Sequence, residues 1–174
     1  MSTHEGHSLN NQLPASLATR FDHVAMAAPR IRDLLPLYVG LLGARFYSGA
    51  DNTRVGFRAL QLVLANGAKI ELLEPLPDST FFDRFFQRTG GGGLHHITCK
   101  VPDITAAIGA ARQAGYTPTN AFLDDAAWQE VFLHPKETGG VLIQMVQAVE
   151  SDPPAGSIAE VLAGGGKYGT GIPS

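Results

Sequence analysis

Four side chains with metal-binding potential stand at matched positions in two similar halves of the chain: His23, Glu71, His96 and Gln144. An offset of 73 residues relates the two histidines, and the same offset relates the glutamate to the glutamine. Two imidazoles with two oxygen donors suit Zn, Fe, Co, Ni or Mn better than Ca or Mg. The pattern predicts one site for a divalent transition metal, shared by the two halves.

Strand parity predicts that these four side chains lie on one face of a sheet. In a strand, successive side chains point to opposite faces. In each of the four strand segments the bulky aliphatic neighbours take the other face, where helices can cover them. His95 has the opposite parity to His96 and is predicted to be structural. The face that holds the ligands otherwise carries mostly small residues.

The elements around these residues repeat as two βαβββ modules, which makes the predicted fold class α+β. Apolar residues between 31 and 42 follow the spacing of an amphipathic helix that Gly43 ends. In the second half Asp103 is a plausible N-cap of a matching helix. Residues 60–75 and 131–146 each have the pattern of strand, Gly-containing turn and strand.

One domain, residues 20–149, is predicted to contain both modules, 20–89 and 94–149. Residues 1–19 are polar, and residues 150–174 are rich in Gly and Pro. Both end segments are predicted to be flexible tails, apart from a turn near Ile158 in the second.

Composition excludes several classes of protein. The 174 residues carry a net charge of −3, whereas a general nucleic-acid binder usually has a basic surplus. No apolar run approaches the roughly 18 residues of a membrane span, and no secretory signal is visible. A single cysteine, Cys99, fits a reducing compartment. We therefore expect a cytoplasmic protein with no nucleic-acid or membrane partner.

The segments GGLHHITCKVPDI and FLHPKETGGVLIQM, with the weaker DHVAMA and KIELLEPL, resemble the vicinal oxygen chelate (glyoxalase/bleomycin resistance/dioxygenase) superfamily. Within it they are most similar to the methylmalonyl-CoA epimerase family, over residues 21–147. The resemblance implies two modules that form a cupped mixed sheet around one metal, in a homodimer, with ligands His23, Glu71, His96 and Gln144. It also implies a small-molecule substrate such as an acyl-CoA thioester, for which Arg58, Lys100 and Lys136 are candidate phosphate contacts.

The chain departs from close members of that family at Gln144, where they usually have Glu. A carboxamide can coordinate a metal through its oxygen, but it cannot accept a proton at neutral pH. Glu71 is then the one carboxylate of the four and the candidate base. We expect an isomerase or epimerase in which a metal assists proton transfer next to a carbonyl.

Three other functions remain open from the sequence. A glyoxalase I-like lyase would also use Gln as a ligand, and a non-haem iron dioxygenase would use two His and one carboxylate. The third is a non-catalytic binding protein, which would commonly have lost the ligand set. Oxygen uptake separates the dioxygenase from the isomerase, and metal analysis separates the binding protein from both.

Overall fold

A computed structural model of the chain describes residues 17 and 19–167, so most of the predicted N-terminal tail lies outside the described residues. Its eight strands are β1 (Arg20–Ala27), β2 (Arg45–Asn52), β3 (Phe57–Val63), β4 (Lys69–Pro75), β5 (Gly93–Lys100), β6 (Pro118–Asp125), β7 (Trp128–Leu133) and β8 (Leu142–Ala148). The helices are η1 (Ile31–Asp33), η2 (Pro36–Leu41), α1 (Asp83–Thr89), α2 (Ile104–Gln113) and α3 (Ile158–Leu162). Within the described residues, no helix has the length and apolar character needed to cross a membrane.

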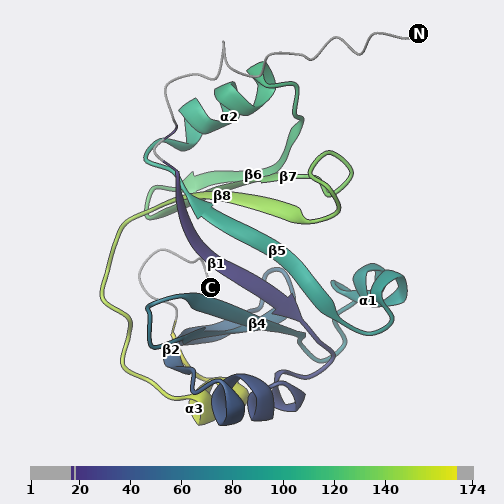
Figure 1. The fold of residues 1–174 in the computed structure, drawn as a ribbon, viewed down its shortest axis with the longest axis vertical. Coiled ribbons are helices and arrows are strands. Elements are labelled where there is room, and N and C mark those ends of the chain that lie inside the picture. The colour runs from purple at the N-terminus through teal and green to yellow at the C-terminus, as the bar shows by residue number, and fades with distance from the viewer. Residues whose placement is uncertain (1–16, 18, 168–174) are drawn as a thin grey trace, which may run out of the picture.

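All eight strands form one curled mixed sheet, in the order β2-β3-β4-β1-β5-β8-β7-β6. β1 pairs with β4 and β5 pairs with β8 in parallel, and the antiparallel pair β1–β5 joins the two modules at the centre. In Figure 1 α2 lies beside β6–β8 at one end, and α3 lies beside β2 at the other. The predicted fold, two βαβββ modules with a cupped sheet, is confirmed.

The helical segment of the first module differs from a regular α-helix. It consists of a 3-10 turn, η1, followed by a short π-helix, η2, that has Pro36 at its start. Proline has no N–H and clashes with the carbonyl four residues earlier, so an α-helix cannot pass through it unchanged. Ile31 is nevertheless fully buried and packs with Leu60 and Leu72 as the apolar spacing predicts.

The helix of the second module, α2, forms as predicted. The Asp103 side chain accepts a hydrogen bond from Ala106 N at 2.9 Å and so caps the helix N-terminus. The buried face of α2 covers Val131, Leu133 and Met145 of β7 and β8. Because these strands alternate, the residues between them point to the other, concave side of the sheet.

Part of the predicted C-terminal tail is helical and packed. Ser157 caps α3, and Val161 within it is fully buried in the core of the first module with Leu60 and Leu62. The Arg58 guanidinium also donates to the Leu162 carbonyl at 3.2 Å. The chain that leaves β8 therefore returns to cover the first module, an arrangement that its Gly and Pro content did not indicate. Residues 168–174 of this tail lie outside the described residues.

Candidate metal centre and active-site cavity

The structure brings the four predicted ligand residues together on the concave side of the four central strands: His23 on β1, Glu71 on β4, His96 on β5 and Gln144 on β8. Their exposed fractions are between 2% and 7%. All four line one cavity of about 460 Å³. The two halves of the sheet thus contribute equally to one buried polar site.

Three of the four side chains converge closely enough to share one ion. Glu71 Oε2 lies 3.5 Å from His23 Nε2 and 3.5 Å from His96 Nε2, and one ligand atom of each lies within 4.8 Å of the others. Such separations suit ligands that bind one ion at about 2.0–2.2 Å. His96 Nε2 is buried and has no hydrogen-bond partner among the described residues. A buried polar atom of this kind calls for an explanation, and a bound metal supplies one.

Gln144 is tied into the site through both ends of its carboxamide. Its Oε1 accepts a hydrogen bond from the Thr98 hydroxyl at 2.6 Å, and that hydroxyl lies 3.0 Å from His23 Nε2. Its Nε2 donates to Glu130 Oε2 at 2.6 Å. The amide oxygen is therefore linked to His23 through Thr98, and the amide nitrogen faces Glu130.

The residue before each ligand histidine orients that histidine. Asp22 Oδ2 lies 2.8 Å from His23 Nδ1, and His95 Nδ1 lies 2.9 Å from His96 Nδ1. A hydrogen bond that takes the Nδ1 proton leaves the Nε2 lone pair for a metal. Strand parity predicted a structural role for His95, and the structure places it beside His96 and at the cavity. Asp22 and His95 are 73 positions apart, the offset that relates the two histidines.

Burial and mutual charge set the protonation of this cluster. Burial alone would lower the pKa of His23, but Glu71 and Asp22 raise it to about 9. Burial would raise the pKa of Glu71, but the two histidines and Gln61 lower it to about 2. Burial lowers the pKa of His96 to about 3 and that of His95 to about 4. Without metal the centre thus contains a charged Glu–His pair beside two neutral imidazoles.

Lowering the pH from 6.5 toward 4 is expected to destabilise the metal-free protein. In this range the unfolded chain protonates His95 and His96, while the folded chain keeps both neutral, so the unfolded state binds more protons. His23, with a folded-state pKa of about 9, opposes this slope near pH 6.5 and adds none below about pH 5.5, where it is protonated in both states, so the slope is read below that pH. Each neutral histidine contributes at most about 1.4 kcal/mol per pH unit. Denaturant unfolding of chelator-treated protein checks this, and His95→Phe should halve the slope. A free energy of unfolding that stays constant or rises on acidification would contradict it.

The rest of the cavity is mostly apolar, and several aromatic rings contribute to it. Phe57, Phe81, Trp128 and Phe132 line it, and the Arg54 guanidinium lies 4.3 Å above the Phe122 ring. Such a lining shields a small polar centre from water and leaves room for a short acyl group.

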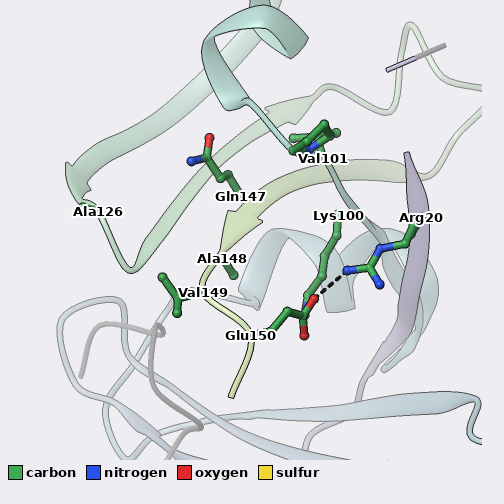
Figure 2. Close-up of a pocket in the computed structure, with 9 residues that line it drawn as sticks. Arg20, Lys100, Val101, Ala126, Gln147, Ala148, Val149 and Glu150 are labelled. Carbon is green, nitrogen blue, oxygen red and sulfur yellow. Dashed lines mark hydrogen bonds and ion pairs between the residues drawn. The ribbon is translucent and has the colours of Figure 1, made fainter. Parts of the chain in front are cut away.

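A second pocket, of about 270 Å³, lies between Arg20, Lys100 and Glu150 (Figure 2). Arg20 pairs with Glu150 at 2.6 Å, and Lys100 lies 3.3 Å from Glu150 and 3.4 Å from Asp22. Arg58, another candidate phosphate contact, is similarly paired with Asp51 and Glu74. Arg58 and Lys100 thus already have carboxylate partners.

Known proteins resemble this chain along most of its length. Residues 22–132 match the model of the Glyoxalase/Bleomycin resistance protein/Dioxygenase superfamily. The mitochondrial methylmalonyl-CoA epimerase of Homo sapiens is 32% identical over 131 residues, 74% of each chain. The ethylmalonyl-CoA/methylmalonyl-CoA epimerase of Cereibacter sphaeroides is 32% identical over 131 residues, 74% of this chain and 97% of its own.

Solved structures resemble the fold as well. Methylmalonyl-CoA epimerase from Mycobacterium tuberculosis aligns with a TM-score of 0.65 at 28% identity, over 75% of this chain and 88% of its own. A methylmalonyl-CoA epimerase in complex with methylmalonyl-CoA and NH4+ aligns with a TM-score of 0.63 at 26% identity, over 78% and 99%.

Proposed function

The chain belongs to the glyoxalase/bleomycin resistance protein/dioxygenase superfamily, and on that premise we propose that it epimerises an acyl-CoA thioester at the carbon next to the carbonyl. The observation that carries this is the convergence of Glu71, His23 and His96 at the polar end of an aromatic cavity. The epimerases among its relatives favour this reaction over the lyase, dioxygenase and binding-protein alternatives.

We propose that His23, Glu71 and His96 hold a divalent metal, with Gln144 Oε1 as a fourth ligand. The unpartnered Nε2 of His96 supports this set, as does the position of Gln144 Oε1, which shares the Thr98 hydroxyl with His23 Nε2. When bound, the metal would act as a Lewis acid that polarises the thioester carbonyl oxygen.

Glu71 is the proposed base. Gln61 Nε2 donates to its Oε1 at 3.1 Å and holds the carboxylate in the cavity, while its Oε2 faces the two histidines. A carboxylate bound to the metal cannot offer the same lone pair to a proton, so Glu71 must bind weakly or detach when substrate enters. Arg54 forms no ion pair among the described residues, and we assign it to the anionic parts of the substrate.

We also infer a cytoplasmic homodimer. Large apolar side chains are exposed on the described part of the chain, among them Leu41 at 76% and Phe21 at 58%. A second copy that covers such residues would remove apolar surface from water. Light scattering of the purified protein tests the dimer.

Metal removal is expected to abolish proton exchange at C2 of methylmalonyl-CoA, and return of a single transition metal is expected to restore it. The exchange is followed by mass spectrometry in D2O with protein stripped by a chelator and reloaded with Co, Ni, Zn, Mn or Fe. Substrate with metal but no protein is the control. Absence of exchange with every metal would refute the epimerase proposal.

A further inference from the structure

In each module a glutamine donates a hydrogen bond to a glutamate on the neighbouring strand, within the last two strands of the module. The glutamate lies on the last strand of the first module but on the second-to-last strand of the second module. In the first module Gln61 on β3 donates to Glu71 on β4 at 3.1 Å. In the second module Gln144 on β8 donates to Glu130 on β7 at 2.6 Å. Gln144, at the fourth ligand position, is not a carboxylate. The carboxylate of Glu130 lies on the neighbouring strand and lines the same cavity.

The alternation of β7 directs Glu130 into this cavity. Val131 and Leu133 pack under α2, whereas Trp128, Glu130 and Phe132 line the cavity. Glu130 Oε2 accepts hydrogen bonds from Trp128 Nε1 at 3.0 Å and from Gln144 Nε2 at 2.6 Å. Its Oε1 forms no hydrogen bond among the described residues. One oxygen is thus fixed and the other is free to meet a ligand.

We propose that Glu130 is the second acid–base residue of the epimerisation, on the face of the reacting carbon opposite Glu71. This role rests on the proposed function. Inversion at carbon requires proton removal from one face and proton delivery to the other, and the neutral carboxamide of Gln144 can accept no proton. Glu71 and Glu130 are the two carboxylates among the described residues that line the cavity, and they come from different modules.

The proposed step is balanced without any further reactant. Glu71, as the carboxylate, forms an O–H bond to the hydrogen that leaves C2, and the C–H electron pair becomes the C=C bond of the enolate. The carbonyl π pair moves onto the oxygen. Glu130, a carboxylic acid at the start of this turnover, then delivers the proton on its otherwise unbonded Oε1 to the opposite face as the electron pairs return. The reverse reaction uses the two carboxyl groups in the opposite order.

Glu130→Gln tests the role, because an amide oxygen can still accept from Trp128 and Gln144. We expect a decrease of about 10²- to 10⁴-fold in the interconversion of the two methylmalonyl-CoA epimers. Metal stoichiometry should be unchanged, and one epimer should still exchange its C2 hydrogen in D2O with retention. Glu137→Gln, the same change at an exposed residue of this module, should have no effect.

The outcomes separate the two proposals. If the wild-type protein exchanges no C2 hydrogen with any metal, the proposed function is wrong and the role of Glu130 is wrong with it. If the wild-type protein epimerises and Glu130→Gln epimerises equally well, only the role of Glu130 is overturned. Loss of metal from Glu130→Gln together with loss of both exchange reactions would assign a structural role and likewise overturn it.

Discussion

Glu71→Gln is expected to reduce turnover of the metal-loaded protein by about 10²- to 10⁴-fold, while the protein still binds a divalent metal. The amide keeps one oxygen that can coordinate a metal in place of Glu71 Oε2, while its NH2 group replaces the Oε1 that accepts from Gln61 Nε2, and it cannot take a proton. Steady-state epimerisation and metal titration of the same preparation measure the two properties separately.

Glu150→Gln is the matched control, because Glu150 is exposed and lies at the second pocket, outside the aromatic cavity. It should retain wild-type turnover. Retained activity in Glu71→Gln would show that Glu71 is a ligand only. Loss of both metal and activity would leave the assignment of the base without support, and the metal titration distinguishes this case.

Gln144→Glu is expected to raise metal affinity and to lower the stability of the metal-free protein. The change adds a second negative ligand, which strengthens metal retention. It also replaces the amide nitrogen, 2.6 Å from Glu130 Oε2, with a carboxylate oxygen. Two carboxylates at this distance cannot both ionise freely, and a hydrogen-bond donor is lost, at a cost of about 1–3 kcal/mol.

The double variant Glu130→Gln/Gln144→Glu provides the internal control. It restores one donor and one acceptor between β7 and β8 and moves the carboxylate to the fourth ligand position. Its free energy of unfolding without metal should return close to the wild-type value, and its metal affinity should stay high. Metal affinity and stability of Gln144→Glu equal to those of the wild type would refute both expectations.

The repeat and the strand period were enough to predict that the four polar residues of the centre would meet. A strand alternates with a period of two, so residues at one offset in two similar modules take equivalent places on one face. The structure places His23, Glu71, His96 and Gln144 on the concave side accordingly. The N-cap of α2 could also be predicted from the sequence, because Asp103 accepts a hydrogen bond from a backbone N–H only three residues away.

Two segments differ from their predicted conformation, one because of a local residue and one because of long-range packing. Local apolar spacing indicated a regular helix where Pro36 imposes η1 and η2. The turn predicted at residues 158–162 forms as α3, but the Gly and Pro content around it did not indicate that the first module holds it. In both cases the local conformational preference of the sequence is small, so a single proline or a buried contact outweighs it.

The sequence by itself determined which residue types face the cavity, whereas only the tertiary structure decided their partners. The contacts of Thr98 with Gln144, and of Gln144 with Glu130, depend on strand register and on the curl of the sheet. Neither quantity is encoded in a spacing along the chain, because register is fixed by the pairing of distant segments. Gln61 lies directly opposite Glu71, whereas Glu130 reaches Gln144 diagonally past Phe132, and only the assembled strand pairs show this difference.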